Sequence, residues 1–296
     1  MTRRRLDAEL VRRGLVRSRA EARAAIEAGL VTVGGRPAVK PSTLVGPDEP
    51  VALARSPRRF VSRGGEKLEA ALERFGIEVA GRDCLDVGAS TGGFTDCLLR
   101  RGAARVAAVD VGYGQLAWEL RTDPRVTVLE RTNARELSPE DLPFRPQVVV
   151  ADLSFISLAL VVPALARVAA PGAVFVLLVK PQFEAGRGEV GRGGVVRDVG
   201  AWRRAVLRVA EACRAAGVEP VDVAASPLLG PAGNVEFLLH AAAGAPRRDL
   251  GGSLERALAE AARLSAGARH EDGGDPSAAG AGDPAGGGGV GCGASA

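Results

Sequence analysis

The chain has 296 residues, 46% of them hydrophobic, and a formal net charge of +4, so it is long enough for two domains with buried cores. Its four cysteines have no CxxC spacing and only two histidines are present, which excludes a zinc cluster and leads us to expect no bound metal. The N-terminus lacks the apolar core of a signal peptide, and the most apolar region, residues 155–179, is interrupted by two prolines, so we expect a cytoplasmic protein that does not enter a membrane.

The first segment, residues 1–60, is basic and has the pattern of two short helices followed by a hairpin. Residues 1–65 carry 14 Lys and Arg against 6 Asp and Glu, whereas the rest of the chain is mildly acidic. Gly14 and Gly29 are predicted to end the helices, and Gly34 begins the turn of the hairpin. A basic module joined to an acidic body is typical of a domain that docks on a polyanion, with a solvated arginine-rich surface as the alternative interpretation.

The motifs RLDAEL, GLVRSRAEA and IEAGLVTVGGRPAVKPS of this segment resemble, in order and spacing, the S4 RNA-binding domain. The resemblance implies a module that docks on structured RNA through contacts to phosphate, which give affinity but little choice of base sequence. The basic residues that we expect to contact RNA are Arg4, Arg5, Arg13, Arg17, Arg19, Arg23 and Lys40, together with Arg63 in the joint that follows.

The second segment, residues 61–243, alternates strand-like runs with helical patterns, which predicts an α/β fold with a parallel sheet covered by helices on both faces. Strand-like runs lie near residues 84–87, 106–111, 126–129, 148–152, 174–179, 221–224 and 235–239. Helical patterns lie near residues 66–75, 93–101, 158–169 and 202–215. We expect the last two strands to pair antiparallel at one edge of the sheet.

The third segment, residues 244–296, is dominated by Gly, Ala, Pro and Asp. Such a composition does not bury a core, so we expect a low-complexity, mostly disordered tail that is interrupted by one weak helix near residues 253–264. The tail is therefore predicted to lie outside both folded segments.

A glycine-rich loop, residues 88–93, follows the strand-like run LDV and precedes a helical pattern, as in loops that hold a ligand at a helix N-terminus. A P-loop is excluded because Phe94-Thr95 replaces its Lys-Ser or Lys-Thr, and the spacing departs from the G-x-G-x-x-G of dinucleotide loops. A purely structural turn is a further interpretation. S-adenosylmethionine (SAM) is favoured because the ammonium of its methionine end suits the carboxylate of Asp86 at the strand end.

Two more strand ends support a SAM site. Asp110 ends the next strand and can accept hydrogen bonds from ribose hydroxyls, while Asn133, after the third strand, is placed to face the adenine edge. The residues that we expect to contact SAM are Asp86, Gly88, Ser90, Gly92, Gly93, Phe94, Asp110, Asn133 and Asp152.

The acceptor of the methyl group is indicated by what the chain lacks. The fourth strand ends in ADLSF, without the proline pair that is usual in enzymes that methylate the amino groups of bases. The chain also has no Pro-Cys of the kind found in enzymes that methylate pyrimidine carbon atoms. These two absences point to oxygen as the acceptor atom.

Four charged residues lie where a buried ion needs a partner: Lys67 before the sheet, Asp152 and Lys180 at strand ends, and Glu236 in the last strand. They are interpreted either as structural ion pairs or as a catalytic set. In the catalytic interpretation, Lys180 removes or polarises the proton of a ribose 2′-hydroxyl while the two acids hold the lysines in place. Proximity and orientation then supply much of the acceleration.

The order Lys67, Asp152, Lys180, Glu236 resembles the catalytic set of the FtsJ-like ribose 2′-O-methyltransferases. Together with SRGGEKLEAAL, DVGASTGGFTDCLL, LVKPQFE and GNVEFLL, behind an S4-like segment, residues 3–243 resemble the TlyA family, which is also known as hemolysin A. The resemblance implies a Rossmann-like, SAM-dependent methyltransferase that acts on cytidine 2′-hydroxyls of 16S or 23S ribosomal RNA, or both, within ribosomal subunits. We expect a monomer.

Two other functions remain open at this point. One is a membrane-active hemolysin, and the other is an RNA-binding protein whose methyltransferase domain is inactive. The glycine-rich tail departs from the family pattern.

Overall fold

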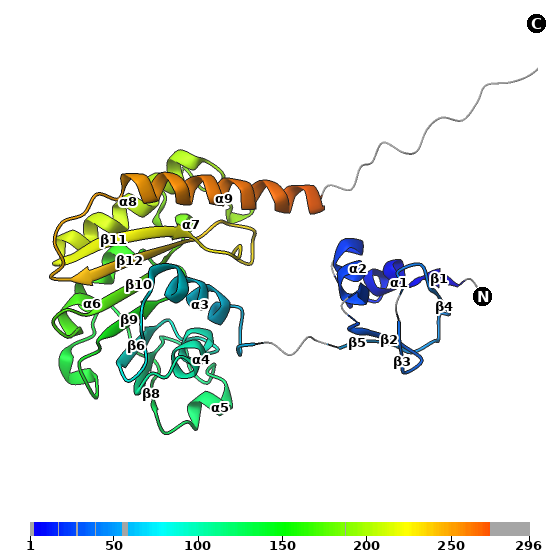
Figure 1. Cartoon of the computed structure of the whole chain (residues 1–296), viewed down its shortest axis with the longest axis horizontal. Coiled ribbons are helices and arrows are strands. Elements are labelled where there is room, and N and C mark those ends of the chain that lie inside the picture. The colour runs from blue at the N-terminus through cyan, green and yellow to red at the C-terminus, as the bar shows by residue number, and fades with distance from the viewer. Residues whose placement is uncertain are drawn as a thin grey trace, which may run out of the picture.

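The computed structural model describes residues 3–16, 18–27, 29–38, 40–54, 59–186 and 188–272. Within these ranges the chain forms a small N-terminal part and a larger part built on a seven-stranded sheet (Figure 1). None of the helices described is long and apolar enough to cross a membrane.

The N-terminal part has the two helices and the hairpin that the sequence predicts. The helices are α1 (Leu6–Arg12) and α2 (Arg19–Glu27), and the hairpin joins β2 (Val31–Val33) to β3 (Arg36–Pro37). Three further strands were not predicted: β1 (Arg4–Arg5), which pairs with β4 (Leu44–Val45), and β5 (Val51–Leu53), which pairs with β2. Their hydrophobic core includes Leu6, Leu10, Ile26 and Val31, all almost fully buried.

The large sheet has the strand order β11-β12-β10-β9-β6-β7-β8. Its strands are β6 (Asp83–Val87), β7 (Arg105–Val109), β8 (Val126–Leu129), β9 (Val148–Ala151), β10 (Val174–Val179), β11 (Val218–Ala225) and β12 (Phe237–Ala243). The strands from β10 to β8 are mutually parallel, and β12 runs antiparallel to both β10 and β11. The expected α/β fold and its antiparallel edge pair are confirmed.

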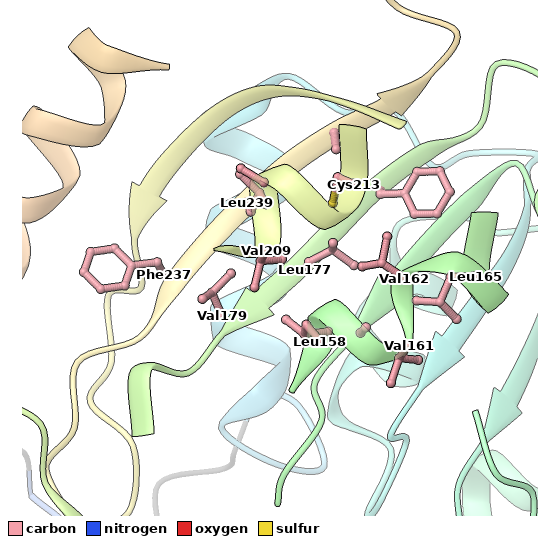
Figure 2. Close-up of a cluster of buried hydrophobic side chains, with 14 of the residues drawn as sticks. Leu158, Val161, Val162, Leu165, Leu177, Val179, Val209, Cys213, Phe237 and Leu239 are labelled. Atoms are coloured by element: carbon pink, nitrogen blue, oxygen red, sulfur yellow. The ribbon is translucent and has the colours of Figure 1, made fainter. Parts of the chain in front are cut away.

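Neighbouring residues of each buried strand point to opposite faces of this sheet, and most of them are apolar on both faces. Helices therefore cover both faces. On one face, Leu85 and Val149 pack with α6 (Val162–Val168) and α8 (Val199–Ala215), and Figure 2 shows this cluster around Leu177 and Val209. On the other face, Cys84 packs with α3 (Gly64–Phe75) and α4 (Gly93–Arg100). The short helices α5 (Trp118–Arg121), η1 (Pro139–Asp141), η2 (Leu158–Leu160), α7 (Pro181–Glu184) and η3 (Arg192–Gly194) lie in the connections.

The C-terminal helix corrects the prediction that residues 244–296 form a tail outside the fold. Helix α9 (Gly251–Asp272) has 22 residues, so it is longer than the predicted 253–264. Leu254, Ala257, Leu258 and Ala261 form one stripe at helical spacing and are buried in the core with α8 and β11. The folded part therefore extends past residue 243, whereas the prediction for residues 273–296 lies outside the described residues.

Two leucines of α9 test whether this helix belongs to the core. Leu254 is 3% exposed and Leu264 is 37% exposed. We expect Leu254→Ala to lower the free energy of unfolding by about 2–4 kcal/mol, because it opens a cavity in the core. The matched control Leu264→Ala should change it by less than about 0.5 kcal/mol. Urea unfolding followed by tryptophan fluorescence measures the free energy of unfolding of both variants. A loss for Leu254→Ala as small as that for Leu264→Ala would mean that α9 does not stabilise the domain.

Candidate active site

The predicted catalytic residues meet at one edge of the sheet. Asp152 directly follows β9 and Lys180 directly follows β10, and these parallel strands end at the same edge. Strand β12 is antiparallel to β10 and pairs Phe237 with Val179, so Glu236, just before β12, arrives at that edge as well. Lys67 reaches the edge from the first turns of α3.

The four side chains form two ion pairs. Lys67 Nζ donates to Glu236 Oε2 at 2.5 Å, with the two side chains only 8% and 1% exposed. Lys180 Nζ lies 2.6 Å from Asp152 Oδ1 and donates a hydrogen bond of 2.9 Å to Ser154 Oγ. All four predicted residues line one cavity of about 290 Å³, together with Ser154. We call this the lysine cavity.

A second cavity of about 350 Å³ adjoins the lysine cavity. Four residues line both: Gly88, Ser90, Asp152 and Ser154. The second cavity is lined by polar groups such as Asp110 and by apolar side chains such as Leu153. We call it the strand-end cavity.

The glycine-rich loop closes tightly over the ends of the strands. Gly88 has φ +85°, and a Cβ on it would lie 2.4 Å from the carbonyl oxygen of Asp152. Gly92 has φ +96°, and its Cβ would lie 2.2 Å from Leu120 Cδ1. Both positions therefore require glycine for the backbone conformation and for close packing. Ser90 N, between them, donates to Asp110 Oδ2 at 2.8 Å.

Asp86 lies behind this loop and lines neither cavity. It is fully buried, and its Oδ2 accepts a hydrogen bond of 2.7 Å from Thr95 Oγ1. In the part of the chain that the structure describes, its other oxygen has no hydrogen-bond partner. Burial raises the pKa of Asp86 to about 7, and the negative charges of Asp152 and Asp110 act in the same direction.

Three other residues that were expected to contact SAM lie at the start of α4, and their contact with SAM stays a prediction. Gly93 and Phe94 line the lysine cavity, because they begin α4 on the side of Lys67. Gly92 lines neither cavity, since it packs against Leu120.

Asn133 also lines neither cavity, although its neighbours Thr132 and Ala134 line the strand-end cavity. Its side-chain amide donates to Glu136 and its side-chain oxygen accepts from Arg135 N. The polar atoms of Asn133 therefore serve the turn in which it lies, and its contact with an adenine stays a prediction.

Sequence reasoning missed Ser154 and Phe155, which follow Asp152. Phe155 lines the strand-end cavity, yet its side chain is 91% exposed and its φ is +65°. A bulky residue in this conformation is strained, which is a feature of functional sites. Its ring centroid lies 5.2 Å from that of Phe183. Neither residue type nor spacing signals a positive φ at a phenylalanine.

The arginines expected to bind RNA have different environments. Arg63 is exposed and lines the lysine cavity, and Arg4 and Lys40 are exposed on the N-terminal part. Arg5, Arg19 and Arg23 are about half exposed and all approach Asp7. The prediction for Arg17 lies outside the described residues.

Arg13 is a correction to the expected RNA contacts. Its guanidinium donates to Glu9 and to the backbone oxygens of Gly46, Pro47 and Glu49, and its side chain is only 21% exposed. Arg13 therefore braces the turn before β5 instead of facing a ligand.

Comparisons with known proteins agree with this architecture. The family model described as FtsJ-like methyltransferase matches residues 60–243, and the S4 domain model matches residues 4–51. The chain is thus an FtsJ-like methyltransferase with an S4 domain in front.

Individual relatives are more specific. The chain is 60% identical to the 16S/23S rRNA (cytidine-2′-O)-methyltransferase TlyA of Mycobacterium tuberculosis over 79% of this chain and 88% of that protein. It is 39% identical to hemolysin A of Brachyspira hyodysenteriae over 80% of this chain and 98% of that protein. A solved structure named as a hemolysin from Streptococcus thermophilus superposes with TM-score 0.71 at 38% identity, over 92% of this chain and 100% of that one. The chain belongs to the TlyA family.

The buried acid Asp86 gives a prediction about stability and pH. Its pKa in the folded protein, about 7, lies above the usual 3.8, so the folded state binds the extra proton between these values. The contribution of Asp86 to the free energy of unfolding therefore falls as pH rises from about 4 through 7. The free energy of unfolding of Asp86→Asn, which cannot ionise, should therefore rise relative to that of the wild type by a few kcal/mol between pH 5 and pH 8.

Urea unfolding at pH 5, 6, 7 and 8 measures this difference. Glu140→Gln, at an exposed carboxylate, is the control and should follow the wild-type profile. If the free energies of unfolding of Asp86→Asn and of the wild type changed in parallel with pH, Asp86 would not titrate in this range.

Proposed function

We propose that this protein transfers a methyl group from SAM to the 2′-hydroxyl of a cytidine in ribosomal RNA. The observation that carries the proposal is the pairing of Lys67 with Glu236 and of Lys180 with Asp152 around one cavity that adjoins a second. The activity in the name of the Mycobacterium tuberculosis relative supports the choice of substrate.

The residues present fit SAM in the strand-end cavity. SAM combines a charged methionine end, a ribose and an adenine, and this cavity combines the carboxylate of Asp110 with the polar side chains of Ser90 and Gln115 and the apolar Val111 and Leu153. When bound, SAM supplies an electrophilic methyl group on a sulfonium.

The lysine cavity is suited to hold the ribose hydroxyl. Lys180 Nζ is held by Asp152 and Ser154, both of which line the two cavities. In the proposed reaction Lys180 accepts or polarises the proton of the 2′-hydroxyl, the oxygen forms a bond to the methyl carbon, and the bond between that carbon and the sulfur of SAM breaks. Lys67, fixed by Glu236, contributes a positive charge to the lysine cavity. Placing the two reactants in adjoining cavities lowers the entropic cost of reaction.

Phe155 offers a surface for the target base. Its ring is exposed beside the strand-end cavity and is supported by Phe183. Single-stranded or extruded bases stack on such aromatic side chains. A base held there would bring its own ribose toward Asp152 and Lys180, which is the positioning that the reaction requires.

Lys180→Ala tests the catalytic assignment. We expect methyl transfer from labelled SAM to ribosomal subunits that lack the modification to fall by at least about 100-fold, because the group that handles the proton is lost. SAM binding, measured by calorimetry, should change little, because Lys180 does not line the strand-end cavity. The labelled nucleotide should map to a 2′-O-methylcytidine.

Supplying the small and large subunits separately shows which of them is the substrate. Glu140→Gln is the control and should keep wild-type activity. Full transfer by Lys180→Ala would exclude its catalytic role. RNA binding without transfer by the wild type would instead favour an RNA-binding protein with an inactive methyltransferase domain.

Phe155→Ala tests the stacking surface. Stacking of a base on an aromatic side chain contributes about 1–3 kcal/mol, so kcat/KM for the subunits should fall by roughly 5- to 150-fold. Phe155→Tyr retains a ring and should keep most of the activity. If both substitutions had the same effect, the ring would not be what positions the RNA.

A further inference from the structure

Three arginines of the S4 domain converge on one buried carboxylate. Asp7, in α1, is 0% exposed. Arg5 Nε and Nη2 donate to its two oxygens at 3.1 and 3.2 Å, Arg19 Nη2 donates to Oδ2 at 2.8 Å, and Arg23 Nε lies 3.8 Å from Oδ2. The three arginine side chains are 45%, 53% and 56% exposed. One negative charge thus holds three positive groups whose outer surfaces face solvent.

The charge state of Asp7 is fixed by these contacts. Burial alone would raise the pKa of Asp7, but the hydrogen bonds from Arg5 and Arg19 outweigh it and lower the pKa to about 2. The carboxylate is therefore ionised at neutral pH, and the cluster of Asp7 with its three arginines carries an excess charge of about +2.

Each guanidinium has five N–H donors, and Asp7 occupies only some of them. Arg19 directs one nitrogen to Asp7, and the contact of Arg23 is longer than a hydrogen bond. The remaining donors of Arg5, Arg19 and Arg23 are close to one another because all three groups approach the same two oxygen atoms. A group with several acceptor oxygens and a negative charge matches this arrangement, and RNA presents such a group at every backbone phosphate.

We propose that Asp7 is a positioning residue that holds Arg5, Arg19 and Arg23 as a preformed clamp for a backbone phosphate of the RNA. This inference rests on the proposed function, in which RNA is the substrate. An arginine side chain loses rotamer entropy when it is fixed. Asp7 fixes the three side chains before RNA arrives, so that less of this cost falls on binding.

The other buried acid of α1 shows that this arrangement is specific to Asp7. Glu9 is 1% exposed and also contacts two arginines, Arg12 and Arg13. Arg13, however, is largely buried and uses its other donors on the backbone of residues 46–49. Glu9 therefore has one half-exposed partner, Arg12, and one partner used inside the domain, Arg13, whereas all three partners of Asp7 are about half exposed.

The positioning role of Asp7 and the net charge of the domain predict opposite changes in RNA affinity when Asp7 is replaced. Removing an acid makes the S4 domain more basic, and phosphate binding governed by net charge would then become stronger. If Asp7 positions the arginines, Asp7→Asn should bind RNA more weakly. We expect about a tenfold loss of affinity, the size of the loss of one charge-assisted hydrogen bond.

The test measures binding of the full-length protein to purified ribosomal subunits that lack the modification, at one fixed salt concentration. Asp48→Asn removes the same charge from an exposed position of the same domain and should bind as tightly as the wild type, or more tightly. In methyl transfer, Asp7→Asn should raise KM for the subunits more than it lowers kcat. An Asp7→Asn affinity equal to or above that of the wild type would overturn the inference.

A second pair of variants keeps the test valid if Asp7→Asn unfolds the S4 domain. Arg19→Gln removes a clamp arginine, and Arg12→Gln removes an arginine of similar exposure that pairs with Glu9. We expect about a tenfold loss for Arg19→Gln and less than about twofold for Arg12→Gln. Equal losses would overturn the clamp. A wild-type protein that binds subunits but transfers no methyl group would overturn the proposed function alone, because the comparison of affinities does not depend on transfer.

Discussion

Two lysine ammonium groups that are about nine-tenths buried can share one cavity only if each has a carboxylate beside it. The side chains of Lys67 and Lys180 are 8% and 10% exposed, and each lies within 2.6 Å of an acidic oxygen. The fold must therefore bring two lysines and two acidic residues together at the edge of the sheet. Parallel strands bring Asp152 and Lys180 there, but a further parallel strand would bring only its own carboxyl end. The antiparallel β12 instead brings its first residues, and with them Glu236.

The separation of the two cavities depends on backbone packing at Gly88. Because Gly88 has no Cβ, the carbonyl oxygen of Asp152 lies where a side chain would otherwise stand. Asp152 can therefore line both cavities while its carboxylate holds Lys180. A larger residue at position 88 would displace the strand end that carries Asp152, and so change both cavities at once. The glycine-rich loop thus allows the backbone at Gly88 to pack closely against Asp152.

The sequence predicts those features that depend on local pattern. Most strands of the large sheet are short apolar runs followed by Gly, Asp or Lys, so their positions are predicted within a few residues. The pairing of Lys67 with Glu236 joins residues 169 positions apart, and only a family resemblance relates them. Helix α9 was underestimated because only two leucines mark its buried stripe, within an Ala- and Gly-rich segment. Arg13 and Asn133 show a different limit, since residue type does not reveal which neighbours use their donors.

The two ion pairs are not equivalent, and their difference indicates a division of roles. Lys67 is paired with Glu236, whose side chain is 1% exposed, so that both members are held inside the protein. Lys180 is paired with Asp152, which is 23% exposed and lines both cavities, and it also contacts Ser154, which does the same. A proton can be exchanged only by a group that reaches the reacting atoms. In the proposed function, proton handling therefore belongs to Lys180, whose partners line both cavities, and Lys67 acts as a fixed charge.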